Sequence, residues 1–403
     1  MLDIHPVVPA LLELTGYPLY IYSMRTDQPT QQRGPTATLV FMPRASVKGR
    51  GTVWAIEHRF TSERHQSVDD GWGSLEQAAR EEVATPATQI IEQRVKAILS
   101  GNDSPDIPFD LSINPYRGCE HGCVYCFARP THSYLNLSPG LDFETKIVAK
   151  VNAAERLREA LRARSYEPLP LNIGSATDAY QPAERRLGIT RSLIDVLAEY
   201  RHAFSIITKS SGIERDIDLL GPLARDRLAA VYVSMPTLDP ALARVMEPRA
   251  TAPERRLRTI ERLAEAGIPV GVSVSPVIPF LNEPELERIL ERARDAGATT
   301  AFSTVLRLPW EVNPLFQQWL QTHFPDRAAR VMARVRDLRG GRDNDSHFRQ
   351  RMSGQGAWAQ LLSQRFEKAA QRLGLDRERI ALDLSQFRRP TGNMSAPVQS
   401  TLF

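Results

Sequence analysis

The sequence is poor in cysteine, and this scarcity argues against two kinds of protein. Its 403 residues include three cysteines, an odd number, and nothing else marks the chain as secreted. Small secreted domains depend on a dense, even set of disulfides, so no disulfide framework is expected. Structural zinc sites usually have two separated pairs of ligands, and a second pair is lacking.

Long hydrophobic runs are missing as well. No apolar run approaches the roughly 18 residues that a membrane-spanning helix requires, so a membrane enzyme is not expected. The N-terminus lacks the continuous apolar stretch of a signal peptide, because it is interrupted by Asp3, Pro6, Pro9 and Glu13. With 42% apolar and 24% charged residues, the composition is that of a soluble globular protein. We expect a cytoplasmic location, where thiols stay reduced.

A large excess of charge of one sign is also absent. The net charge of +4 permits an anionic partner without requiring one. Residues 326–351, however, hold eight arginines against four aspartates. This segment is either a phosphate-binding surface for nucleic acid or a solvated helix face. Its arginines are Arg327, Arg330, Arg334, Arg336, Arg339, Arg342, Arg349 and Arg351.

What the chain does have is one compact motif that holds all of its cysteines. Cys119, Cys123 and Cys126 stand at C-x3-C-x2-C spacing within residues 114–126. Three thiolates on one loop can hold a [4Fe-4S] cube by three irons, whereas such clusters are otherwise closed by a fourth cysteine. An iron left open is a coordination site, as in three-ligand catalytic zinc sites. The alternative is a structural zinc site completed by His121.

This motif, with Tyr125 directly before its last cysteine, resembles the signature of radical S-adenosylmethionine (SAM) enzymes. The wider pattern over residues 102–105, 114–119 and 138–146 is similar to the bacterial branch related to spore photoproduct lyase, often labelled DNA repair photolyase. The resemblance covers roughly residues 45–390. It implies that an electron donor reduces a [4Fe-4S] cluster, which splits bound SAM into methionine and a 5'-deoxyadenosyl radical. It also implies that the cluster ligands are Cys119, Cys123 and Cys126.

The resemblance also implies residues that contact SAM. The turn after the second predicted strand resembles the segment that holds the methionine amino group, which implicates Ser175, Thr177 and Asp178. An ordinary polar turn is the alternative there. Ser234, at the end of the fourth predicted strand, corresponds to a position that contacts ribose or methionine. Tyr125 is expected near the adenine.

Charged residues after later strands are further candidates. Lys209 could pair with a carboxylate or phosphate. Glu247 and Arg249, which frame a proline, would clamp the cofactor or substrate, unless they form a loop salt bridge. Arg307 is expected to reach a carboxylate in the pocket.

One feature departs from spore photoproduct lyase. In that family an extra cysteine returns a hydrogen atom to the product radical, and this chain has no cysteine to spare. Repair by that route is therefore not expected unless Tyr116, Tyr134 or Tyr180 takes its place. The resemblance favours a radical SAM enzyme that acts on nucleic acid. The rival hypothesis is a non-enzymatic nucleic-acid-binding protein stabilised by zinc or a cluster.

From residue 107 onward, short β-rich runs alternate with amphipathic helices, which predicts a parallel sheet with crossover helices. Strands are predicted at 110–114, 169–174, 204–208, 229–234, 269–274 and 299–305. Helices are predicted near 153–163, 190–200, 214–225, 253–266 and 283–295. The fold class is therefore α/β, a partial (β/α)6 barrel whose chemistry lies at the C-terminal ends of the strands.

The remaining segments surround this barrel in the predicted organisation. The expected regions are an irregular extension (1–45), a wrapping segment (46–106), the barrel (107–309), a helical region (310–388) and a flexible tail (389–403). Residues 74–100 are expected to be poorly structured or helical. Within the tail, Gln399, Leu402 and Phe403 resemble the pentapeptide by which bacterial proteins dock on the replication sliding clamp; a frayed tail is the alternative.

Overall fold

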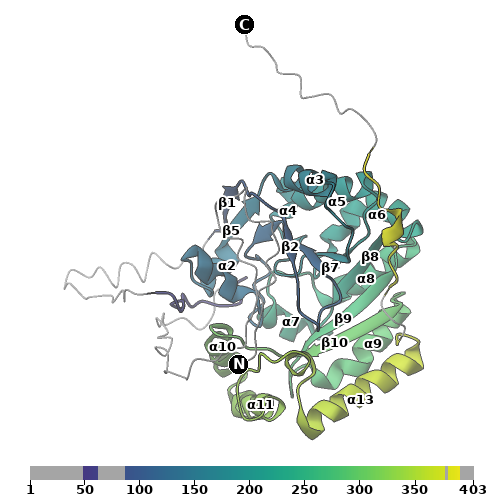
Figure 1. Cartoon of the computed structure of the whole chain (residues 1–403). Helices are drawn as coiled ribbons and strands as arrows, with labels where there is room; N and C mark the ends of the chain where they lie inside the picture. Colours follow the sequence, from purple (N-terminus) through teal and green to yellow (C-terminus); the bar gives the residue numbers. More distant parts are fainter. Residues whose placement is uncertain (1–48, 62–86, 377–379, 391–403) are drawn as a thin grey trace, which may run out of the picture. The chain divides into compact units, whose positions relative to one another are not determined.

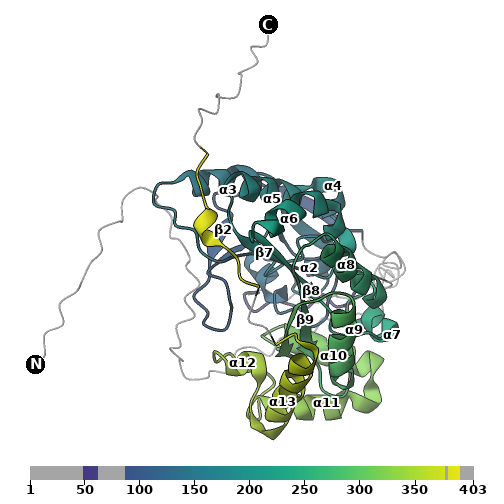
Figure 2. The ribbon, with the colours of Figure 1, turned by 90° about the vertical axis from the view of Figure 1, so that its right-hand side faces the viewer.

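A seven-stranded sheet forms the centre of the computed structural model, which describes residues 49–61, 87–376 and 380–390 (Figures 1 and 2). The strand order is β10-β9-β8-β7-β6-β3-β2. The parallel strands are β3 (Leu111–Ile113), β6 (Leu171–Ile173), β7 (Phe204–Thr208), β8 (Ala229–Ser234), β9 (Val270–Val277) and β10 (Thr300–Val305). β2 (Leu99–Gly101) pairs with β3 in antiparallel orientation at one edge. The six predicted strands and the partial (β/α)6 barrel are confirmed.

The crossover helices occupy the stretches whose apolar periodicity predicted them. They are α3 (Ala153–Arg162), α5 (Ile189–Glu199), α6 (Ile217–Arg225), α8 (Pro253–Glu265) and α9 (Leu286–Asp295). Gly267 and Gly297 follow α8 and α9 with φ of 74° and 101°, the left-handed conformation that glycine supplies at helix ends. Shorter helices are α2 (Leu141–Thr145), α4 (Glu184–Leu187) and α7 (Pro240–Met246).

Three main helices form the described part of the predicted C-terminal helical region, and the last of them packs against β10 and α9 (Figure 1). They are α10 (Val312–His323), α11 (Pro325–Leu338) and α13 (Gly356–Leu373), with a short α12 (Gln350–Ser353) between the last two. Trp319 and Phe316 are buried in an apolar cluster that is separate from the main core around the sheet. This cluster also includes Val124 of the cysteine loop. The helical region therefore helps to cover the cysteine loop. No helix of the described residues is long and apolar enough to cross a membrane.

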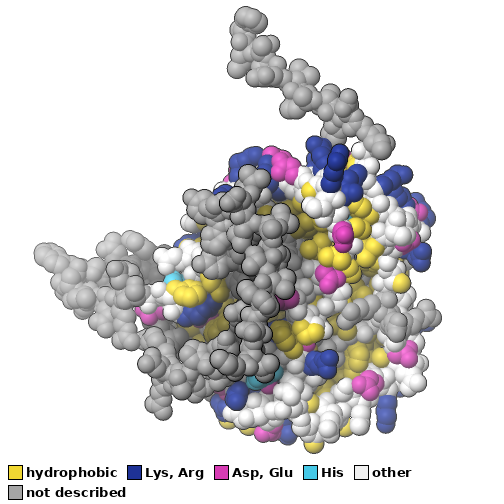
Figure 3. Space-filling view, viewed as in Figure 1, with side chains coloured by type: hydrophobic (Ala, Val, Ile, Leu, Met, Phe, Trp, Pro, Cys, Tyr) yellow, Lys and Arg dark blue, Asp and Glu magenta, His cyan; other side chains and the backbone are white. Residues whose placement is uncertain are grey.

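The arginines of residues 326–351 do not form one uniform basic surface. Arg339 is 1% exposed and donates to the backbone carbonyls of Leu306 and Gln350. Arg351 is also buried and forms an ion pair with Asp106. On the face drawn in Figure 3, the Lys and Arg side chains of the described residues are dispersed and mixed with acidic ones. Part of the arginine-rich segment is therefore structural.

A second, three-stranded sheet was not predicted. It has the order β1-β5-β4, with β1 (Gln89–Gln93), β4 (Tyr116–Arg117) and β5 (Lys146–Lys150). The expectation that residues 74–100 are poorly structured or helical was wrong for the described part, which contains β1 and β2. β1 is polar, and its strand conformation depends on its parallel pairing with the distant β5. The extension 1–45 and the clamp-like residues Gln399, Leu402 and Phe403 lie outside the described residues.

The segment before this sheet packs closely against the cysteine loop. Arg50 to Trp54 are buried, although a loop wrapped around the outside was expected. A Cβ on Gly51 would lie 1.6 Å from the carbonyl oxygen of Gly122, and one on Gly140 would lie 2.0 Å from that of Trp54. At both positions two backbone segments pack so closely that there is no room for a Cβ, and only glycine fits.

We therefore expect Gly51→Ala to destabilise the protein. The added methyl group must push two backbone segments apart, and overpacking of this kind typically costs about 1–3 kcal/mol. The measurement is the free energy of urea unfolding, with Gly101→Ala as the matched control because its Cβ would meet nothing within 4 Å. Equal free energies of unfolding for the two variants would contradict the close approach.

Candidate active site

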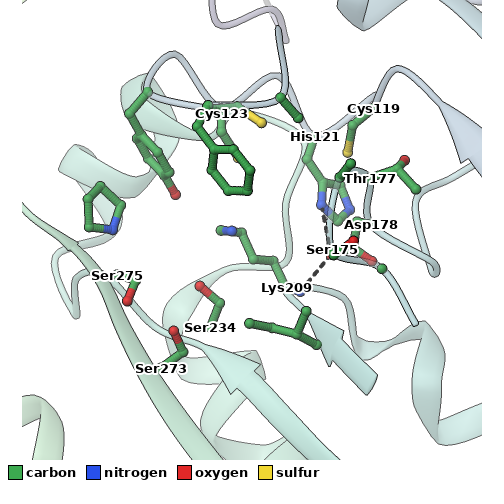
Figure 4. Close-up of a pocket in the computed structure, with 18 of the residues that line it drawn as sticks. Cys119, His121, Cys123, Ser175, Thr177, Asp178, Lys209, Ser234, Ser273 and Ser275 are labelled. Atoms are coloured by element: carbon green, nitrogen blue, oxygen red, sulfur yellow. Dashed lines mark hydrogen bonds and ion pairs between the residues drawn. The ribbon is translucent and has the colours of Figure 1, made fainter. Parts of the chain in front are cut away.

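A pocket opens at the C-terminal ends of the parallel strands, with about 900 Å³ of free space including its mouth (Figure 4). The loop between β4 and η1 (Arg129–Leu135) forms one wall, and residues at or after the ends of β6 to β10 form the rest. The structure brings together the three cysteines and the five residues that the resemblance implied for SAM binding. They are Cys119, Cys123, Cys126, Tyr125, Ser175, Thr177, Asp178 and Ser234.

A buried arginine holds the cysteine loop in place. Arg129 is fully buried and forms an ion pair with the equally buried Glu144 at 2.5 Å. Its Nε donates to the carbonyl of Cys123 at 2.9 Å, and its Nη2 donates to that of Gly122 at 3.3 Å. The second carboxylate oxygen of Glu144 accepts from the Gly51 amide at 2.9 Å. The loop is thus attached to the segments on both sides of it.

Two glycines let the loop turn tightly enough to carry three converging cysteines. Gly118 and Gly122 have φ of 81° and 68°. Residues with a side chain adopt such positive φ angles only at a cost in free energy. A Cβ on Gly118 would lie 2.8 Å from the ring of His132, and one on Gly122 would lie 2.7 Å from the carboxylate of Glu144. Both positions are therefore closed to larger residues.

The cysteine side chains suit a soft metal group. Cys119 and Cys123 are each 7% exposed, and Cys126 is partly exposed. Burial raises the pKa of Cys119 well above its ordinary value and that of Cys123 to about 12. Buried thiols with such pKa values are protonated at neutral pH, whereas coordination to a metal deprotonates a thiol outright. The donor set of three thiolates at the edge of an open pocket fits an iron–sulfur cluster with one iron left accessible.

The zinc alternative finds no support in the position of His121. Its Nδ1 lies 3.3 Å from a carboxylate oxygen of Asp178, and both side chains are nearly buried (Figure 4). Within residues 49–61, 87–376 and 380–390, no three His, Cys, Asp or Glu side chains are arranged to hold a single metal ion. A tetrahedral zinc site requires four ligands around one ion.

Asp178 connects several loops beneath the cysteines. Besides His121, its carboxylate accepts from the Thr208 hydroxyl at 2.7 Å, the Lys209 amide at 2.7 Å and the Tyr180 amide at 2.8 Å. Burial by itself raises the pKa of Asp178, but His121 and these donors hold it well below its ordinary value. The carboxylate is therefore ionised at neutral pH, and protein donors already contact both of its oxygens. These contacts suit Asp178 to holding the loops of the pocket together rather than to binding the amino group of SAM directly.

The hydroxyl groups of Thr177 and Ser175 differ in their hydrogen bonds within the protein and in their burial. The Thr177 hydroxyl donates to the carbonyl of Gly118 at 2.7 Å, which ties the turn after β6 to the cysteine loop. The Ser175 hydroxyl accepts a hydrogen bond from the side-chain amide of Asn114 at 3.1 Å. Ser175 itself is half-buried at the pocket wall. Ser175 is thus the more available of the two for a ligand.

A row of hydroxyl groups from two neighbouring strands lines the opposite wall. Ser234 of β8 is paired in register with Ser273 of β9, and Ser275 follows two residues later (Figure 4). The Ser275 hydroxyl oxygen is buried and has no partner within the described residues. Sequence reasoning identified Ser234, expected only backbone contacts with adenine from the segment that begins at Ser275, and missed Ser273. The alternation of Ser273 and Ser275 in an otherwise apolar strand was the available signal.

Tyr125 and Glu247 form a buried link on the cysteine side of the pocket. The Tyr125 hydroxyl donates to Glu247 at 2.5 Å, and Glu247 forms a buried ion pair with Arg256. Arg249 pairs instead with Glu120 at 3.1 Å. Neither Glu247 nor Arg249 lines the pocket, and they do not pair with each other. The expectation that Glu247 and Arg249 clamp a ligand was therefore wrong, and so was the alternative that they form a salt bridge with each other. Each pairs with a different residue.

None of the tyrosines proposed to replace the missing cysteine lines the pocket. Tyr116 is buried with its hydroxyl on Glu184, and the hydroxyl of Tyr180 donates to Asp216 at 3.0 Å. Tyr134 is 54% exposed. These positions do not suit hydrogen transfer to a substrate in the pocket, because a donor must reach the radical directly.

The pocket also holds two cationic side chains. Lys209, after β7, extends from below toward the cysteine loop (Figure 4), with its ammonium 5.8 Å from the centre of the Tyr125 ring. Arg307, after β10, lines the pocket as well. Within the described residues, neither side chain forms an ion pair with a carboxylate. The arrangement can therefore bind anionic groups.

Comparisons with known proteins found one matching family and several similar proteins. The Radical SAM superfamily model matches residues 113–293. An uncharacterised protein of Mycobacterium tuberculosis is 37% identical over 234 residues, which are 58% of this chain and 68% of that protein. A tyrosine mutant of spore photoproduct lyase is 14% identical, with a TM-score of 0.47 over 70% of this chain and 79% of the other. The lyase complexed with dinucleoside spore photoproduct is 15% identical, with a TM-score of 0.44 over 59% and 66%.

We expect Arg129→Met to destabilise the protein strongly. The change leaves the Glu144 carboxylate buried without its partner, and breaking a buried ion pair in this way costs about 3–5 kcal/mol. The free energy of chemical unfolding measures the effect. The control is Arg94→Met, which breaks a pair with Glu155 on the surface and should leave unfolding unchanged. A similar small effect for both variants would show that the buried pair is dispensable.

Proposed function

Because this chain belongs to the radical SAM superfamily, whose members bind a [4Fe-4S] cluster and SAM, we propose that Cys119, Cys123 and Cys126 are the protein ligands of its cluster. The observation that carries the proposal is the convergence of all three thiols on one buried loop at the edge of the pocket. The protein is a radical SAM enzyme. When bound, the reduced cluster and SAM together supply a 5'-deoxyadenosyl radical that removes a hydrogen atom from a substrate.

The residues around the cysteines would bind and orient SAM. The Lys209 ammonium is placed to hold the methionine carboxylate, since it lies on the cysteine side of the pocket. The Ser175 hydroxyl can accept a hydrogen bond from the amino group, and Ser234 can bond to ribose or methionine. Tyr125, fixed by its bond to Glu247, offers an apolar ring face toward the adenine. The protein's contribution is geometry and exclusion of water.

Replacing any one of the three cysteines by alanine should remove the cluster. Two thiolates leave the cube under-ligated, so the visible absorbance after anaerobic reconstitution with iron and sulfide should be lost. Formation of 5'-deoxyadenosine with a reductant should fall below detection. The control is His121→Asn, which should retain the iron content. Retention of one zinc per chain, with no SAM cleavage by the wild type, would favour the non-enzymatic alternative.

We further propose that the substrate is nucleic acid, on the strength of an exposed aromatic platform. Phe60, Tyr134 and Trp310 are 53%, 54% and 56% exposed, which is unusual for three large rings grouped together. The Arg59 guanidinium lies 4.6 Å from the centre of the Phe60 ring, 5.2 Å from that of Tyr134 and 4.5 Å from that of Trp310. Arg59 is also paired with the buried Glu311 at 3.1 Å, so the platform offers ring faces more than net charge. Exposed aromatic rings of this kind bind unpaired bases by stacking.

Trp310→Ala should weaken the binding of a single-stranded oligonucleotide. Loss of one stacked base typically costs about 1–3 kcal/mol, roughly a 5- to 150-fold change in affinity. Fluorescence anisotropy at two salt concentrations measures it. Leu361→Ala is the control, because Leu361 is 52% exposed and outside this platform. Equal affinity for both variants would remove nucleic acid from the proposed function and leave the radical SAM activity in place.

A further inference from the structure

Arg307 is the unusual charge of the pocket, because its guanidinium lacks the acceptors that other buried arginines have. Its Nη1 is 3.8 Å from the sulfur of Met352, a weak acceptor, and its Nε is buried with no hydrogen-bond partner within the described residues. The nearby Arg339 also has a buried Nε without a partner, but its two Nη atoms donate to backbone carbonyls, and Arg351 pairs with Asp106. Arg307 differs in that its Nη atoms have neither a carbonyl nor a carboxylate acceptor among the described residues. Buried donors are rarely left unpaired in native proteins.

The surroundings of Arg307 add positive charge rather than neutralising it. Burial and, to a smaller extent, the charges of Arg351 and Arg339 together lower the pKa of Arg307 to about 10. The guanidinium is still protonated at neutral pH. Asp106 is the acid nearby, but its carboxylate is engaged by Arg351 at 2.5 Å. A bound anion would therefore be attracted by the positive charges around Arg307 and could accept hydrogen bonds from its guanidinium.

Arg307 and Lys209 reach the pocket from different strands of the sheet. Lys209 follows β7 and Arg307 follows β10, and two strands lie between them in the sheet. Lys209 contacts the ring of Tyr125 within the cysteine loop. Arg307 lies against the ring of Phe127, two residues further along the same loop, 5.5 Å from its centre, and Phe127 is 51% exposed. SAM has a single carboxylate, which Lys209 is placed to hold, so Arg307 is left for a second anion.

We propose that Arg307 binds an oxyanion of the substrate, either a phosphate or a carboxylate, next to the exposed ring of Phe127. The planar guanidinium matches the two oxygens of such a group in a fork, and within the described residues its Nη atoms have no carbonyl or carboxylate acceptor. The neighbouring ring offers a flat apolar surface to the part of the substrate that adjoins the anion. The inference rests on the proposed radical SAM function, because it assigns the SAM carboxylate to Lys209.

The test uses the reconstituted full-length protein with saturating SAM, so that the Lys209 side of the pocket is occupied. Inorganic phosphate and acetate are the probes, and their dissociation constants are measured by calorimetric titration. Arg307→Gln should weaken binding of the better probe by about tenfold or more, as expected for loss of a charge-assisted bidentate contact, while Arg307→Lys should recover part of it. SAM affinity, measured by equilibrium dialysis, should change less than about twofold, since Arg307 does not hold the SAM carboxylate.

The control is Arg330→Gln, which also removes a cation over an aromatic ring, here Phe280, but outside the pocket lining. Equal probe binding by Arg307→Gln and the wild type would overturn the inference. So would wild-type protein that binds neither probe, or an Arg307→Gln variant that loses SAM instead. If Arg307→Gln does not fold, as judged by its thermal midpoint, Arg307→Lys replaces it: weaker probe binding than in the wild type would support the inference, and unchanged binding would overturn it. Failure of the proposed function gives a different result, because the wild type would then bind no SAM.

Discussion

The buried ion pair between Arg129 and Glu144 is the constraint on which the cysteine loop depends. All five N–H groups of Arg129 meet fixed acceptors, four of them backbone carbonyls. Removing two charges from water is unfavourable, and it is tolerated only where the geometry satisfies both groups. Because carbonyls of Gly122 and Cys123 belong to the loop itself, the loop cannot move without leaving a buried charge unpaired.

A second buried acid extends this rigidity from the loop to the barrel. Asp178 follows β6, and its carboxylate contacts His121 of the cysteine loop as well as Thr208 and the Lys209 amide after β7. The side chain of Lys209 is then directed into the pocket while its backbone is held from below. The pocket therefore has a rigid polar floor, and the groups that remain free face the cavity: hydroxyls on one wall and two cations on separate strands.

The barrel was predictable from the sequence because its elements are defined by local patterns. Strands buried on both faces are continuous apolar runs, as in β8, and the crossover helices repeat apolar residues every three to four positions. The small sheet could not be predicted this way. β1 is short and polar, and it becomes a strand only by pairing with β5, which follows more than 50 residues later in the chain. Local propensity carries no information about such a partner.

The sequence by itself determined the chemistry of this protein: three cysteines at a fixed spacing on one loop, and polar residues after the strands of a parallel sheet. Only the tertiary structure decided which of those polar groups are available. Asp178 and Glu247 look equally reactive in the sequence, yet each is held by donors from distant segments, whereas Arg307 is left without a carboxylate. Hydrogen-bond partners come from residues far apart in the chain, so availability is a property of packing and cannot be read from spacing.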